Sequence, residues 1–184
     1  MGWSYTKKPA NVSNFIRSEL NHEGEESSYR VLDLAIVQLR EAYVAFEKRN
    51  KINSDDIEVI GVVCLLDYVD GEIGIKVMDE TSLPYYFKCP ARILRMLTPT
   101  ENKNALEWRK ECENYHEKNA RKMTEGQIIK FATPFNFRGY GEATMFRYTR
   151  NGRKEFFYAL SDEKKPRFAC RITNWKQREF EIIS

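Results

Sequence analysis

Turn-forming residues divide the last third of the chain into short apolar runs, and this pattern strongly restricts the fold. The runs are Ile128–Phe131, Ala143–Thr149, Glu155–Leu160, Arg167–Thr173 and Arg178–Ile183. Asn151-Gly152 separates two of them, and Asn-Gly between alternating runs is the strongest short signal of a β-hairpin. Five strands in about 60 residues predict a small barrel of the SH3 or OB type.

The preceding part of the chain predicts both helices and strands. Asn11 can cap a helix whose apolar residues recur at helical spacing as far as Leu20. Ile57–Leu66 is β-branched and almost continuously apolar, which indicates a buried strand. Residues 29–48 fit one long helix or two strands, because periodicity alone cannot separate these alternatives in so apolar a segment.

These patterns predict two domains. We expect an α+β protein in which a mixed α/β N-terminal domain, residues 1–122, docks on a partner. A helix that contains Trp108 joins it to a small basic all-β domain, residues 123–184, that resembles a barrel. The far end of this helix is polar on all sides, which is typical of a helix between two bodies.

Positive charge is concentrated in the C-terminal domain. Residues 125–184 contain 12 Lys and Arg against 7 Asp and Glu, although the net charge of the whole chain is only +3. The same segment holds 12 of the 24 aromatic residues. Cations that neutralise phosphates and rings that stack on bases are the chemistry of single-stranded nucleic-acid binding. We therefore expect this domain to bind nucleic acid.

The candidate nucleic-acid-binding residues lie on or beside the predicted turns and strand ends. They are Arg138, Tyr140, Arg147, Arg150, Arg153, Lys154, Trp175, Lys176 and Arg178. Tyr140 and Trp175 are the better stacking candidates, because burial is less natural in a turn. The aromatic residues that we assign to the core are Phe131, Phe146, Phe156 and Phe168. The alternative is that most aromatic residues form the core and the arginines form its solvated face.

Catalytic residues cannot be assigned from motifs. The chain has neither a Gly-rich phosphate loop nor a nucleophile elbow, so its status as an enzyme is open and we expect no cofactor. Acidic residues gather around one predicted hairpin, where they could hold Mg²⁺ for phosphodiester cleavage. They are Asp67, Asp70, Glu72, Asp79 and Glu80. Acids in turns also serve solubility and capping, and on balance we expect no metal.

The cysteines favour a reducing compartment. The four are widely spaced without a Cys-x-x-Cys pair, which is typical of buried thiols in a cytosolic protein. A metal site would have to join Cys112 to His116, one helical turn away, with ligands from elsewhere. No apolar run approaches the roughly 20 residues of a membrane span, and the start of the chain has no secretory signal. We expect a cytoplasmic protein.

Several short motifs are spread over residues 1–115. They are Met1-Gly2-Trp3, Val63-Cys64-Leu65-Leu66-Asp67-Tyr68, Met78-Asp79-Glu80-Thr81, Cys89-Pro90-Ala91-Arg92-Ile93-Leu94, and Leu97-Thr98-Pro99-Thr100-Glu101-Asn102 followed by Ala105-Leu106-Glu107-Trp108-Arg109. With these motifs the chain resembles an uncharacterised family of small proteins carried by phages, plasmids and integrated conjugative elements. The resemblance favours two strands for residues 29–48.

The resemblance implies a functional class, although no activity is assigned to the family. Small proteins of mobile elements frequently disable host defences, and the Lys-, Asn- and Ile-rich composition suits a low-GC Gram-positive host, where Cas9 systems are frequent. We expect an anti-defence protein of the host cytoplasm, in particular a type II anti-CRISPR. It would bind a Cas9–guide-RNA complex, with the C-terminal domain contacting the RNA, and whether it also promotes cleavage of the RNA stays open.

Two other functional classes stay open at this point. One is a nuclease or nucleic-acid-modifying enzyme that uses Mg²⁺ and the acids between Asp67 and Glu80. The other is a non-catalytic accessory or structural protein of the mobile element. The sequence does not predict an oligomeric state.

Overall fold

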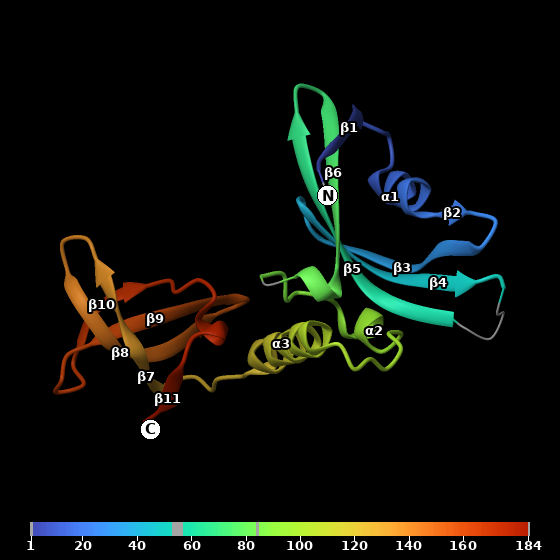
Figure 1. Cartoon of the computed structure of the whole chain (residues 1–184). Helices are drawn as coiled ribbons and strands as arrows, with labels where there is room; N and C mark the ends of the chain where they lie inside the picture. Colours follow the sequence, from blue (N-terminus) through green and yellow to red (C-terminus); the bar gives the residue numbers. More distant parts are fainter. Residues whose placement is uncertain (1, 53–56, 84, 184) are drawn as a thin grey trace. The chain divides into compact units, whose positions relative to one another are not determined.

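The computed structural model describes residues 2–52, 57–83 and 85–183. The chain forms two compact units, Met1–His116 and Glu117–Ser184, which we call unit 1 and unit 2 (Figure 1). Each unit has an antiparallel sheet and a hydrophobic core of its own.

Unit 1 is built on six antiparallel strands in the spatial order β1-β6-β5-β4-β3-β2. The strands are β1 (Ser4–Lys7), β2 (His22–Glu23), β3 (Ser27–Gln38), β4 (Glu41–Asn50), β5 (Ile57–Val69) and β6 (Glu72–Asp79). The helices are α1 (Val12–Leu20), the 3₁₀ turn η1 (Glu80–Ser82), α2 (Ala91–Leu94) and α3 (Lys103–Ala120). Asn11 caps α1 as expected, because its side chain accepts a hydrogen bond from the Asn14 backbone N–H at 3.0 Å.

Helices cover both faces of the unit 1 sheet (Figure 1). On one face, Ile16 of α1 packs in a core with Val62 of β5. On the other face, Ile93 of α2 and Trp108 of α3 pack in a second core with Val63. Successive residues of β5 therefore face two different cores, which explains why the strand is apolar at almost every position.

The expectation of a mixed α/β N-terminal domain in an α+β protein is wrong. The described residues form a mostly β protein with two antiparallel sheets, and the helices of unit 1 only cover its sheet. Residues 29–48 lie in β3 and β4, which pair along their length, for example Leu34 with Val44. The helix interpretation looked plausible because both faces of these strands carry apolar residues.

Unit 2 contains five antiparallel strands in the order β10-β9-β8-β7-β11. They are β7 (Ile128–Phe137), β8 (Gly141–Asn151), β9 (Lys154–Leu160), β10 (Pro166–Cys170) and β11 (Phe180–Ile182), with the 3₁₀ turn η2 (Trp175–Gln177) before β11. Along the described ladders the sheet ends at β10 and at β11, so it is not a closed barrel. Its core is rich in rings, which include Phe131, Phe146, Tyr148, Phe157 and Trp175.

Candidate nucleic-acid interface

The strands of unit 2 direct alternate residues to opposite faces of the sheet. Phe146, Tyr148 and Phe157 point to the core. Arg147 of β8 and Tyr158 of β9 lie between these core positions and are direct cross-strand partners. Because successive side chains of a strand point to opposite sides, this pair lies on the face away from the core.

We call this side of the sheet the outer face, and it carries both cations and rings. Its polar and aromatic residues are Lys130, Arg147, Thr149, Lys154, Phe156, Tyr158 and Arg171, and the same register adds the apolar Ile128 and Met145. Thr149 is the cross-strand partner of Phe156, and the Arg171 guanidinium lies 5.0 Å from the centre of the Phe156 ring. Tyr158 is 41% exposed. A guanidinium over a ring forms a cation–π contact that also holds the cation in place.

The cations of the outer face are not neutralised by neighbouring carboxylates. Within the described residues of unit 2, Lys165 forms an ion pair with Glu163 beyond the end of β9, and the cations of the outer face form none. The Glu125 carboxylate accepts hydrogen bonds from the Thr149 hydroxyl and from the backbone N–H of Arg150. Glu181 is the cross-strand partner of Lys130 but forms no ion pair with it. The outer face therefore carries four cations, Lys130, Arg147, Lys154 and Arg171, against the carboxylates of Glu125 and Glu181, and the exposed ring of Tyr158.

The structure places the predicted cations in four groups. Arg147 and Lys154 lie on the outer face. Arg138 lies with Tyr140 at the turn between β7 and β8, where the Tyr140 ring is 60% exposed. The third group is Arg150, near the end of β8, and Arg153, in the turn between β8 and β9. The two turns flank opposite ends of β8, which at strand geometry is about 33 Å long.

The fourth group surrounds η2. The Arg178 guanidinium lies 4.4 Å from the centre of the Phe135 ring, and Lys176 donates from Nζ to the Asn119 carbonyl at 3.1 Å. Lys176 also lies 5.6 Å from the Trp175 ring centre. Lys176 and Arg178 are held against other residues of unit 2 by these contacts, so their charged groups are less free than that of Arg147 to contact a ligand.

Trp175 is not available for stacking on a base. It is only 4% exposed, packs in the unit 2 core, and donates from Nε1 to Oε2 of Glu155 at 2.8 Å. The sequence predicted a turn at Trp175, and this is confirmed by η2. Burial follows because η2 folds back over the sheet, where Arg121 donates to the carbonyls of Lys176 and Arg178 at 3.2 and 3.1 Å.

Sequence reasoning missed part of the outer face. Lys130, Tyr158, Thr149 and Arg171 were not proposed, and Phe156 was assigned to the core although it is only partly buried beneath Arg171. The useful signal was the alternation within β9, since Phe156 and Phe157 are adjacent and cannot both face the core. The cross-strand register that unites these residues cannot be read from one strand alone.

The acidic residues considered for Mg²⁺ are engaged in other roles. Asp79 accepts hydrogen bonds at Oδ1 from Thr81 N, Thr81 Oγ1 and Ser82 Oγ, at 3.0, 2.6 and 2.9 Å. Burial acts to raise the pKa of Asp79, but these hydrogen bonds outweigh it and lower the pKa below its usual value. Asp79 is therefore the cap of η1.

The other acids of that cluster do not converge on a metal position. Glu80 is buried against Arg109, with two hydrogen bonds of 2.7 and 2.6 Å. Asp67 accepts from the Tyr5 hydroxyl at 3.3 Å, and Asp70 lies in the β5–β6 turn with a φ of 49°. Among residues 2–52, 57–83 and 85–183, no group of three or more His, Cys, Asp or Glu side chains is arranged to hold a metal ion.

Cys112 and His116 do not form a ligand pair either. His116 makes a hydrogen bond of 2.6 Å between Nε2 and the Cys89 carbonyl oxygen. Cys112 is fully buried in the second core of unit 1, and burial, with a smaller opposing hydrogen bond from Cys89, raises its pKa to about 12. A thiol of this kind stays protonated at neutral pH.

Comparison with known proteins gave a match of one family model to part of the chain. The model of a domain of unknown function, DUF6927, matches residues 99–175, which begin shortly before α3 and end at the first residue of η2. Searches of curated proteins and of solved structures gave no significant match. None of the described helices has the length and hydrophobicity needed to cross a membrane.

Proposed function

We propose that this protein binds single-stranded RNA through the outer face of unit 2. The observation that carries the proposal is the cross-strand pair of Arg147 and Tyr158, a cation without a paired carboxylate next to an exposed ring. A guanidinium can neutralise a phosphate while the neighbouring ring stacks on the attached base. Arg171 and Phe156 repeat this combination one step further along the same face.

Stacking on a ring explains why we propose single strands and not duplexes. Bases in a duplex are already stacked on one another, whereas unpaired bases can lie against aromatic side chains. The outer face belongs to an extended sheet, which presents its side chains over a broad surface instead of inserting a helix into a groove. The proposal therefore favours an RNA loop or a single-stranded segment.

We further propose that the RNA is the guide RNA of a Cas9 complex and that the protein acts as an anti-CRISPR of a mobile element. Support comes from the sequence motifs of residues 1–115 and from the positive charge of residues 125–184. In this scheme unit 1 docks on protein while the outer face holds the RNA. Binding alone is sufficient for inhibition, so the scheme needs no catalytic residue.

Two substitutions separate the two interactions of the outer face. We expect Arg147→Ala to reduce the salt dependence of RNA binding by one phosphate contact, a change of about 0.7 in the slope of log K against log salt. We expect Tyr158→Ala to weaken binding by about 1–3 kcal/mol without changing this slope, because stacking releases no counterions. Both are measured by fluorescence anisotropy with a labelled single-stranded oligoribonucleotide over a range of salt.

Matched controls come from unit 1. Arg95→Ala removes an exposed cation and Tyr85→Ala an exposed ring, neither of which belongs to the outer face. If the control variants lose as much affinity as Arg147→Ala and Tyr158→Ala, binding is not localised to the outer face. For the Cas9 scheme, the protein is mixed with Cas9 and guide RNA before target DNA is added. Full target cleavage and intact guide RNA would contradict that scheme, whatever the result for RNA alone.

A further inference from the structure

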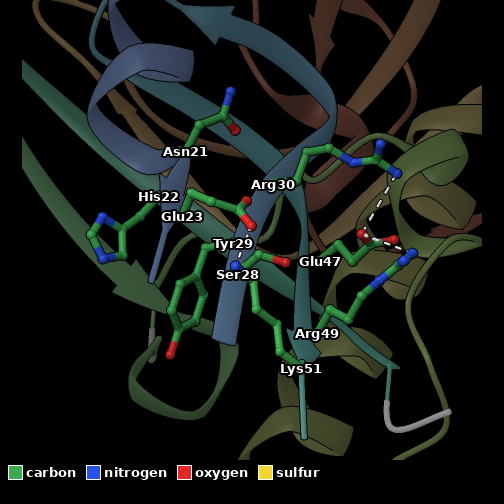
Figure 2. A pocket seen from close by; sticks show the side chains of 9 residues that line it. All are labelled: Asn21, His22, Glu23, Ser28, Tyr29, Arg30, Glu47, Arg49 and Lys51. Carbon is green, nitrogen blue, oxygen red and sulfur yellow. Dashed lines mark ion pairs between the residues drawn. The ribbon is translucent and has the colours of Figure 1, made fainter. Parts of the chain in front are cut away.

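A polar hollow lies in unit 1, where β2 runs beside the start of β3, which pairs with the end of β4 (Figure 2). Its volume is about 570 Å³, and we call it the β2–β4 hollow. The residues that line it are Asn21, His22, Glu23, Ser28, Tyr29, Arg30, Glu47, Arg49 and Lys51. We propose that the β2–β4 hollow binds the phosphate group of a small phosphorylated ligand.

The hollow contains a carboxylate, that of Glu47, between two arginines. Oε1 of Glu47 lies 3.5 Å from Arg30 and 3.6 Å from Arg49, as the dashed lines in Figure 2 show. The Glu47 side chain is 12% exposed, whereas those of Arg30 and Arg49 are 64% and 45% exposed. Glu47 thus holds two guanidinium groups from below and leaves most of their N–H donors open to the hollow.

The other charges of the hollow balance each other. Lys51 pairs with Glu23 and also donates from Nζ to the Gly24 carbonyl at 2.7 Å. The hollow thus has three cations and two carboxylates, which gives it a net charge of +1. Because Lys51 is paired with Glu23, the excess positive charge lies on Arg30 and Arg49. An anion placed there meets an attractive field without having to displace the Lys51–Glu23 pair.

Further polar side chains line the hollow. The Asn21 carbonyl Oδ1 already accepts from Val31 N at 2.8 Å, which leaves its Nδ2 to donate. Ser28, the cross-strand partner of Arg49, adds a hydroxyl on the same side of the strands, whereas the rings of Tyr29 and His22 point away from the arginines and line another part of the hollow (Figure 2). A site with more donors than acceptors fits a ligand group with several oxygen acceptors and a negative charge.

Phosphate meets these requirements better than a carboxylate does. Its oxygens point in several directions and can accept from two guanidinium groups at once, while the planar forks of Arg30 and Arg49 suit bidentate bonds. The volume of about 570 Å³ lies within the usual range of ligand pockets and leaves room for the molecule that bears the phosphate. This proposal is independent of the outer face, which belongs to unit 2.

Binding of inorganic phosphate and of adenosine 5′-monophosphate to the full chain tests the proposal by isothermal titration calorimetry. We expect Arg49→Ala to weaken the binding of both about tenfold or more, because a hydrogen-bonded charge pair is lost. We expect Glu47→Gln to tighten binding about fivefold, because it removes a competing negative charge next to the site. Arg30→Lys keeps the charge but loses the fork, so its affinity should fall between those of wild type and Arg49→Ala.

The matched control is Arg40→Ala. Arg40 also pairs with one carboxylate, Asp67 at 3.7 Å, but it lies at the opposite end of β4. Thermal unfolding of each variant establishes that the fold is retained. The proposal is overturned by absence of saturable binding to wild type, by equal weakening in Arg40→Ala, or by weaker binding in Glu47→Gln. Tighter binding of the nucleotide than of phosphate would assign the rest of the hollow to the nucleoside, and equal binding would limit the site to phosphate.

Discussion

At the scale of single residues, the ion pair of Glu80 and Arg109 is the feature with the largest expected effect on stability. Glu80 is 2% exposed and accepts two hydrogen bonds from Arg109, which also donates to the Thr98 carbonyl at 2.7 Å. Removal of one partner leaves an uncompensated charge in the interior, which is far more costly than loss of the pair as a whole.

We therefore expect Arg109→Ala to lower the free energy of unfolding by about 3–5 kcal/mol. The comparison is Arg92→Ala, which removes a pair with Asp33 at 2.9 Å in a more exposed position. An exposed pair of this kind is worth about 1 kcal/mol or less. Urea denaturation followed by circular dichroism measures both changes. Equal losses for the two variants would show that burial of Glu80 has no special cost.

At the scale of secondary-structure elements, α3 approaches β5 so closely that one position on the strand has no room for a side chain. A Cβ atom added at Gly61 would lie 2.7 Å from Cζ3 of Trp108. The Trp108 indole is held in place by a hydrogen bond of 2.7 Å from Nε1 to the Tyr86 carbonyl, so the ring cannot simply turn away. Gly61 is thus required by helix–sheet packing.

We expect Gly61→Ala to destabilise unit 1 by about 1–3 kcal/mol through overpacking. Trp108→Phe alone should also destabilise, because it leaves a gap and removes the hydrogen bond to Tyr86. In the Gly61→Ala/Trp108→Phe double variant the smaller ring makes space for the methyl group. The double variant should therefore lose less stability than the sum of the losses of the two single variants. Additive losses in this double-mutant cycle would contradict direct contact between the two positions.

Sequence reasoning was most successful for elements whose apolar pattern faces a single core. The five strands of unit 2 and the cap of α1 were found because turns and alternation were clear. It failed to decide between helix and strands for β3, where register shifts between Val31 and Asp33 and between Ile36 and Gln38 break the alternation. Trp175 shows the same limit for a site residue, since the fold of distant strands decided its burial.

At the scale of the whole molecule, buried thiols connect stability to pH. Burial raises the pKa of Cys64 and of Cys112 to about 12 each. In the unfolded chain a thiol titrates near 8.5, so only the unfolded state gains thiolate as the pH rises above that value. Their contribution to stability is complete below about pH 8.5 and is lost progressively up to about pH 12.

We expect the free energy of unfolding to fall between pH 8 and pH 10.5, by up to about 1.4 kcal/mol per pH unit for each buried thiol above its unfolded pKa. Cys64→Ala should start from a lower stability, because it leaves a small gap, but should show a shallower decrease with pH. Urea midpoints at several pH values under reducing conditions give both slopes. Parallel slopes for wild type and Cys64→Ala would exclude this thiol as a source of the pH dependence.

The positions of the three tryptophans have a practical consequence for spectroscopy. Trp108 is enclosed in a core of unit 1 and Trp175 in the core of unit 2, whereas Trp3 is partly open to solvent. The fluorescence of the chain is therefore the sum of three signals, one from a buried indole in each unit and one from the solvent-exposed indole of Trp3. Replacing Trp3 with phenylalanine would leave one optical reporter in each unit, so that melting of one unit could be followed while the other stays intact.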